Sequence, residues 1–219
     1  MNEASGEGKR PGRPPSLTRE DIARAALEAG RERGMEAVSV LAAARVLGVS
    51  HSTLYGYVRD RGEVVFAAVE LATSEFEWPP ADQDWRPLLT AFAEALWTFL
   101  NRYPGMAEVL YALPNAPKPF VRVLVGYGTA LRAAGFSPRD ALVAVDMIVD
   151  LTLCSDIAMR GLDRVHQTAD GPRRLRELLT RVWAELDDSV LEEAAWSGRG
   201  RFDDKLAVIL DGFAARVRR

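Results

Sequence analysis

Apolar residues recur at helical spacing along most of the chain. Thr18 and Asp21 form a capping signal, and from Ile22 to Gly34 apolar residues repeat every three or four positions. This pattern predicts a first helix that starts at Thr18 and stops at Gly34. No segment shows the alternation of apolar and polar residues that is typical of a half-buried strand. The chain is therefore expected to be all-α.

The same spacing, with glycines and prolines as boundaries, predicts about ten helices. Gly48 and Gly135 are expected to end helices, and Pro138 occupies the first position of another. The expected helices are residues 18–34, 40–47, 50–57, 63–76, 85–102, a short stretch after 104, 120–134, 138–160, 172–195 and 202–218. Residues 161–171 are expected to form a loop. The chain divides into a flexible arm (1–17), a compact three-helix unit (18–62) and a larger helical domain (63–219).

The arm is rich in Gly, Pro, Arg and Ser and carries too few apolar side chains to form a packed core. The whole chain has a formal net charge of −3, yet the segment from Gly8 to Arg19 contains four basic residues and no acidic one. Such a segment favours contact with a polyanion. Arg10 and Arg13, each followed by a proline, resemble the Arg-Pro core of AT-hook peptides, which enter narrow minor grooves. The alternative is a solubilising tail.

Composition argues against several classes of protein. The only cysteine is Cys154, which excludes an internal disulfide and a cysteine-based zinc site. The start of the chain lacks the apolar core of a signal peptide, and no run of about 18 apolar residues is present. A cytoplasmic protein without membrane contact is therefore expected. The histidines are His51 and His166, and metal-ligand spacings, phosphate loops and nucleophile motifs are absent, so we expect no cofactor, no metal and no enzymatic activity.

Two short helices around a tight turn at Gly48 match the helix-turn-helix geometry, in which the second helix lies in the DNA major groove. Leu47, Val49 and Leu54 are expected to hold the two helices together, with Ser39 as the cap of the first helix. Hydroxyl and imidazole groups suit both phosphate oxygens and base edges. The polar side chains left to project from this corner are Ser50, His51, Ser52, Thr53, Tyr55 and Tyr57.

Four motifs carry a resemblance to a known family. They are Leu47-Gly48-Val49-Ser50, Thr53-Leu54-Tyr55, Tyr57-Val58 and Arg61-x-Glu63-Val64. Together they resemble the DNA-binding domain of the TetR family of bacterial transcriptional regulators. The resemblance extends over about residues 17–66, and the rest of the chain matches in size and helical layout. It implies a homodimer that binds a near-palindromic operator, represses transcription and releases DNA when a small-molecule effector enters the C-terminal domain.

The resemblance also implies roles for single residues. His51, Ser52 and Thr53 would contact bases or phosphates. The expected DNA-binding residues are Arg10, Arg13, Thr18, Ser39, Ser50, His51, Ser52, Thr53, Tyr55, Tyr57 and Arg61. The chain departs from the family pattern at Leu41, Ala43 and Gly56, the last standing where a bulky or basic side chain is usual. A glycine there removes a contact and loosens the helix end by roughly 0.5–1 kcal/mol relative to alanine.

The larger domain offers candidates for an effector cavity. On the helix over 85–102, Trp97 is expected to project away from the apolar stripe, among polar residues, as in a mixed ligand cavity. The alternative is a tryptophan that covers a helix junction. Several weaker candidates are equally compatible with core packing. The expected ligand-binding residues are Trp97, Asn101, Met106, Tyr111, Tyr127, Met147 and Asp150.

The helix over 138–160 is apolar almost all round and is expected to be buried, with Asp146 and Asp150 one turn apart on one face. These carboxylates could bind a cationic ligand, pair with arginines across a dimer interface or face solvent. Cys154 is expected to be a packed apolar residue. By the resemblance, this helix and the last helix of two subunits form a four-helix interface. Its expected residues are Asp146, Phe202, Leu206, Ile209 and Phe213.

Two other classes stay open from the residues alone, an all-α enzyme and a helical carrier protein that binds a small molecule. An enzyme would have to use Asp146 and Asp150, which form a pair only through helical spacing. A carrier does not explain a capped helix-turn-helix unit beside a basic arm. The sequence therefore favours a DNA-binding regulator.

Overall fold

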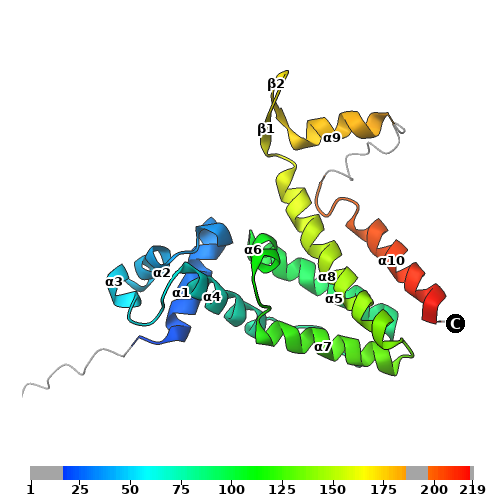
Figure 1. Ribbon diagram of the computed structural model, residues 1–219, viewed down its shortest axis with the longest axis horizontal. Helices are drawn as coiled ribbons and strands as arrows, with labels where there is room; N and C mark the ends of the chain where they lie inside the picture. Colours follow the sequence, from blue (N-terminus) through cyan, green and yellow to red (C-terminus); the bar gives the residue numbers. More distant parts are fainter. Residues whose placement is uncertain (1–16, 186–196, 218–219) are drawn as a thin grey trace, which may run out of the picture.

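The computed structural model describes residues 17–185 and 197–217 (Figure 1). Its helices confirm the all-α class. The elements are α1 (Arg19–Arg33), the 3-10 helix η1 (Met35–Ala37), α2 (Val40–Leu47), α3 (His51–Leu54), α4 (Arg61–Glu75), α5 (Trp85–Arg102), α6 (Met106–Ala112), α7 (Lys118–Ala133), α8 (Pro138–Gly161), β1 (Val165–Thr168), β2 (Gly171–Arg174), α9 (Leu175–Ala184) and α10 (Phe202–Val217). Within the described ranges, no helix is long and apolar enough to cross a membrane.

A short hairpin replaces part of the expected loop and helix. Strands β1 and β2 pair antiparallel, with Val165 opposite Arg174 and Thr168 opposite Gly171. The prediction of a loop over 161–171 and of a helix that begins at Pro172 was therefore wrong. Four-residue strands are too short to show a reliable alternation, and a proline is tolerated in an edge strand. Helix α9 ends at Ala184, and residues 186–195 of the expected helix lie outside the described residues.

Helices α1 to α4 form a small unit at one end of the molecule (Figure 1). Helix α1 packs against both α2 and α4. The core of the unit is apolar and almost fully dehydrated, and it consists of side chains such as Ile22, Met35, Val38, Leu54 and Val64. Burying each of these side chains stabilises the unit by roughly 1.5–3 kcal/mol. The three-helix unit predicted from the sequence is thus a packed structure that continues into α4.

The larger unit is built around α5 and α8, which pack against each other and are flanked by α6, α7 and α10. Its centre is a group of aromatic rings. Trp78 lies 5.5 Å from Phe99 and 5.4 Å from Phe120, measured between ring centroids. The indole N–H of Trp78 donates to the carbonyl of Thr73 at 3.0 Å, so the last turn of α4 is tied to this core.

A second contact joins the two units where η1 meets the turn between α5 and α6. The backbone N–H of Met35 donates to the carbonyl of Pro104 at 2.7 Å. Next to it, Arg31 donates to the Tyr103 hydroxyl at 3.0 Å, and its guanidinium carbon lies 5.0 Å from the Tyr103 ring centre. Gly105 has φ +82°, and a Cβ atom there would lie 3.3 Å from the Met35 nitrogen. The close approach of the two units thus depends on a glycine.

Replacing Gly105 with alanine is expected to lower the free energy of unfolding by roughly 1–3 kcal/mol, because an L side chain is strained at that φ and crowds Met35 and Glu36. The matched control is Gly128→Ala within α7, where a Cβ meets no atom within 4 Å. That control should raise stability by about 0.5–1 kcal/mol through helix propensity. Urea denaturation measures both variants, and equal effects would contradict the account of the contact.

Candidate nucleic-acid interface and effector cavity

The turn between α2 and α3 has the conformation expected from its glycine. Gly48 is left-handed, with φ 66° and ψ 26°, and its N–H bonds to carbonyls of the last turn of α2. Leu54 anchors α3 because its side chain is fully buried. Leu47 is half-buried against the core, whereas Val49 is exposed. The expectation that Val49 helps to hold the two helices together was therefore wrong.

A network of hydroxyls covers the start of α3. Ser50 Oγ lies 2.8 Å from both Ser52 Oγ and Thr53 Oγ1, and it accepts the Thr53 backbone N–H at 3.2 Å. The imidazole of His51 stands edge-on to the Tyr55 ring, with 6.3 Å between the centroids. All these polar side chains are exposed, and Tyr57 is half-buried. The structure thus brings the predicted polar residues together on one convex corner. Helix α3 itself ends at Leu54, earlier than the predicted Tyr57.

Gly56 lies two residues after the end of this helix. A Cβ atom there would meet only the Thr53 carbonyl oxygen, at 3.4 Å, which is ordinary contact. The backbone conformation at Gly56 is not the left-handed one that favours glycine. A side chain would therefore fit at this position, and the glycine leaves the polar corner with one contact side chain fewer than the backbone could carry.

Three other predicted DNA-binding residues stabilise the unit itself. Thr18 exchanges hydrogen bonds with Asp21 in a capping box, and Ser39 accepts the Ala42 N–H at 3.1 Å as the cap of α2. The Arg61 guanidinium donates from Nε to the carbonyl of Val38 at 2.7 Å and from Nη2 to the carbonyl of Glu36 at 2.9 Å. Arg61 therefore ties α4 to the segment around η1. Arg10 and Arg13 lie outside the described residues.

In the larger unit, two of the predicted ligand residues line one cavity. Trp97 and Asn101 border an open cavity of about 400 Å³ beside the C-terminal half of α8. Trp97 is only 9% exposed, and its ring lies 4.9 Å from that of Phe202 on α10. The prediction that Trp97 projects away from the core was wrong, because α10 covers that side of α5. Trp97 thus packs in the junction between α5 and α10 and also borders the cavity.

Sequence reasoning missed the charged residues of this cavity. Asp156 is almost fully buried and accepts Arg160 Nε at 2.8 Å, and Arg176 Nε lies 3.1 Å from Asp163. The signal that could have found the first pair is the four-residue spacing of Asp156 and Arg160 on one helix. No sequence signal places Arg176 here, since it comes from the start of α9.

The other predicted ligand residues lie elsewhere. Met106 is fully buried, and Tyr127 is buried with its hydroxyl donating to the Pro79 carbonyl at 2.8 Å. This burial raises the pKa of Tyr127 to about 12. Tyr111, Met147 and Asp150 are exposed on the surface of the chain. The structure therefore does not unite these five residues in one site.

The face of α8 that carries the aspartates also differs from expectation. Asp146, Asp150 and Cys154 are exposed, so the prediction of a packed cysteine was wrong. For the two aspartates, exposure agrees with the alternative in which they face solvent. No described element covers that face of α8. Three of the predicted dimer residues, Phe202, Leu206 and Phe213, are buried in the core of the same chain, and Ile209 is half-buried. These three side chains hold α10 on its own subunit.

Comparisons with known proteins decide the family. The model of the tetracycline repressor-like C-terminal domain matches residues 78–217. The chain belongs to the TetR family. It is 28% identical over 200 residues to the class A tetracycline repressor of transposon 1721 from Escherichia coli, with 89% of each chain covered. It is 27% identical over 145 residues to the repressor DrrR1 of Streptomyces coeruleorubidus, with 64% of this chain and 54% of that protein covered.

Solved structures of TetR regulators have the same fold. A possible TetR family regulator from Streptomyces coelicolor A3(2) superposes with a TM-score of 0.73 at 21% identity, with 90% of this chain and 99% of that chain covered. BioQ bound to its double-stranded DNA operator gives 0.64 at 20% identity, with 91% and 99% covered. The match to DrrR1 spans just over half of that protein, and the matches to the class D and class H tetracycline repressors span 64% of each.

The small unit of α1 to α4 contains a carboxylate whose charged form stabilises the fold. The backbone N–H of Arg59 donates to Glu63 at 2.8 Å, and Arg19 lies 3.2 Å from the other carboxylate oxygen. The backbone hydrogen bond from Arg59 is the largest cause that holds the pKa of Glu63 below its ordinary value of 4.5, and the Arg59 side chain and the charge of Arg19 lower it further. A lowered pKa in the folded state means that the charged form stabilises the fold above the unfolded value.

We therefore expect the stability difference between the unmodified protein and Glu63→Gln to be largest above about pH 5 and to shrink as the pH falls below 4.5. Urea denaturation at a series of pH values measures this difference. The control is Glu28→Gln on α1, where the carboxylate is exposed and has no hydrogen bond or ion pair with a described residue. A pH-independent difference for Glu63→Gln would contradict the assigned interaction.

Proposed function

We propose that this TetR-family chain is a transcriptional repressor that binds a near-palindromic operator as a homodimer and is released by a small-molecule effector. The observation that carries the proposal is the exposed hydroxyl and imidazole cluster of α3, held on the body of the protein by the buried Leu54. Such a corner offers hydrogen-bonding groups to base edges and phosphates without forming a pocket. Family membership favours this function over the enzyme and carrier alternatives.

In this proposal the predicted DNA-binding residues have two different tasks. His51, Ser52 and Thr53 face the major groove, and Tyr55 contacts a phosphate beside them. Thr18, Ser39 and Arg61 act mainly by fixing the ends of α1, α2 and α4, because their polar groups are engaged within the protein. The basic arm with Arg10 and Arg13 adds contacts to the DNA backbone or minor groove. BioQ with its operator is a precedent within the fold.

The dimer interface is proposed on the outward faces of α8 and α10. Leu142 on α8 is 69% exposed and Val208 on α10 is 72% exposed, although both are large apolar residues. Asp146 and Met147 on α8 are exposed as well, and Gly212 on α10 has no atom near its Cβ position, which permits close approach of a second helix. A two-fold axis through this surface would give two α3 corners related by the symmetry of a palindromic site.

The effector is proposed to bind the cavity beside Trp97, Asn101 and Arg160. This cavity lies next to the elements that join the two units. Arg160 reaches the Leu100 carbonyl near the end of α5, and the next residues carry the Tyr103 and Pro104 contacts to the DNA-binding unit. An effector that favours one arrangement of this junction would shift the position of α3 by as much as it discriminates between the two arrangements.

A double substitution tests the DNA contact. His51→Ala with Thr53→Ala is expected to weaken binding to a duplex selected from random DNA by the unmodified protein more than about tenfold, since each lost base contact costs roughly 1–3 kcal/mol. The matched control is His166→Ala with Thr98→Ala, which removes the same side chains from exposed sites on β1 and α5. Fluorescence anisotropy measures both. Equal affinity of the two double variants would refute the assigned role of α3.

A charge on the outward face of α10 tests the dimer. Val208→Glu is expected to weaken self-association more than about 100-fold, because the symmetric interface would bury the new carboxylate twice. Val165→Glu on β1 is the control, since Val165 is 61% exposed and lies outside the proposed interface. Sedimentation equilibrium gives the dimer dissociation constants. A Val208→Glu protein that stays dimeric would place the interface elsewhere.

A further inference from the structure

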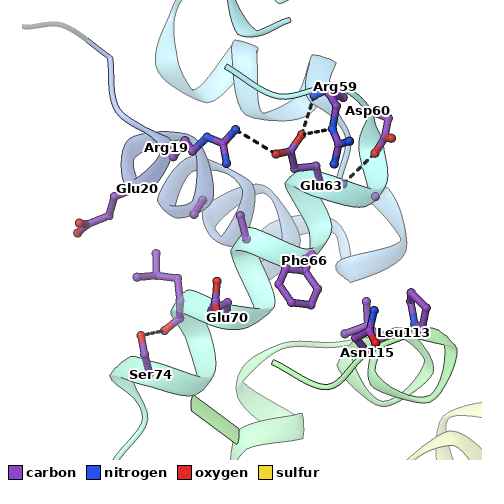
Figure 2. A pocket seen from close by; sticks show the side chains of 15 residues that line it. Arg19, Glu20, Arg59, Asp60, Glu63, Phe66, Glu70, Ser74, Leu113 and Asn115 are labelled. Atoms are coloured by element: carbon purple, nitrogen blue, oxygen red, sulfur yellow. Dashed lines mark hydrogen bonds and ion pairs between the residues drawn. The ribbon is translucent and has the colours of Figure 1, made fainter. Parts of the chain in front are cut away.

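A second, larger cleft lies along α4, away from the proposed effector cavity beside Trp97. It has a volume of about 750 Å³ and shares no lining residue with that cavity. Figure 2 shows its walls, which come from the start of α1, from one face of α4 and from the loop that contains Leu113 and Asn115. Two of these walls belong to the DNA-binding unit and the third to the larger unit. The cleft therefore bridges the two parts of the chain.

The floor of the cleft is apolar. Phe66 projects from α4 toward Leu113 and Asn115 (Figure 2), and its ring is half-buried. Leu71 on α4 and Ala23 on α1 continue the apolar surface. An aromatic ring with one accessible side in a concave apolar wall suits the body of an organic ligand.

The charges around this floor are predominantly negative. The lining includes four carboxylates and two arginines. Both arginines, Arg19 and Arg59, are bound to Glu63 at the upper end of the cleft in Figure 2. Glu70 lies one turn of α4 after Phe66, is half-buried, and forms no hydrogen bond or ion pair through its carboxylate with any residue of the described ranges. The cleft thus presents, beside an aromatic ring, a carboxylate that no described residue binds.

We propose that this cleft binds an organic cation with an apolar or aromatic body. The positive charge lies between the Glu70 carboxylate and the Phe66 ring, where an ion pair and a cation–π contact act together. The apolar body lies on Leu71 and Leu113, and the Asn115 amide offers one further polar contact at the mouth. An organic anion of the same shape is rejected by Glu70.

A ligand in the cleft touches α4 and the loop at Leu113 at the same time. It would therefore fix the distance between these two elements, independently of any effector in the cavity beside Trp97. The proposed repressor function is not required for this binding, which is a property of the chain without DNA.

The test is calorimetric titration of the full chain, without DNA, with tetraphenylphosphonium and with tetraphenylborate, two ions of the same shape and opposite charge. Saturable binding of one tetraphenylphosphonium per chain is expected, with no saturable binding of tetraphenylborate. Glu70→Gln should weaken tetraphenylphosphonium binding about fivefold to tenfold, as for a half-buried ion pair. Phe66→Leu should weaken it about threefold through loss of the cation–π contact.

Glu28→Gln is the matched control, because it removes one carboxylate from the exposed surface of α1 away from the cleft. It should leave the affinity unchanged, and thermal melting checks that each variant is folded. Three results would overturn the proposal. They are the absence of saturable tetraphenylphosphonium binding, an affinity that Glu70→Gln leaves unchanged, and an equal loss in Glu70→Gln and Glu28→Gln.

Discussion

The packing of α4 on two sides holds the two functional parts of this protein in one structure. Val64 and Val65 at its start are buried within the DNA-binding unit, and Ala72 and Thr73 near its end are buried at the larger unit. The helix contacts α1 on one side and α7 on the other. An apolar helix of this kind cannot move without exposing surface on one side, which costs about 25 cal/mol for each Å². Movement of the DNA-binding unit must therefore be a coordinated shift of α4 with its neighbours.

The surfaces with proposed functions are arranged around this helix. The polar corner of α3 is fixed through the buried Leu54, and Arg61 at the first turn of α4 ties that helix to the segment around η1. The proposed effector cavity borders Asn101, three residues before Pro104, whose carbonyl accepts the Met35 N–H. The cleft with Glu70 lies along α4. Under the two proposals, a ligand in either cavity would act on the junction between the two units through different elements. The proposals therefore give two separate routes by which small molecules would alter the position of α3.

Local features of the chain were predictable because they depend on residues close in sequence. The turn at Gly48 and the caps at Thr18 and Ser39 lie where the sequence predicts them, since a turn or a helix end is decided within four residues. The position of Trp97 was not predictable, because the side of α5 on which it lies is covered by α10, about a hundred residues later. The hairpin was not predictable because each of its strands has only four residues, too few to show a clear alternation. The unpaired state of Glu70 is likewise a tertiary property, decided by where Arg19 and Arg59 find their partner.

The most direct test of the account is selection of DNA fragments from a random pool by the full-length protein at moderate salt. If the α3 corners of a symmetric dimer contact DNA, the enriched fragments will contain two inverted copies of one half-site. The centres of the copies will be separated by about one helical turn, ~10 base pairs, or a multiple of it. Failure to enrich any sequence, or enrichment of a single unrepeated half-site, would contradict the account.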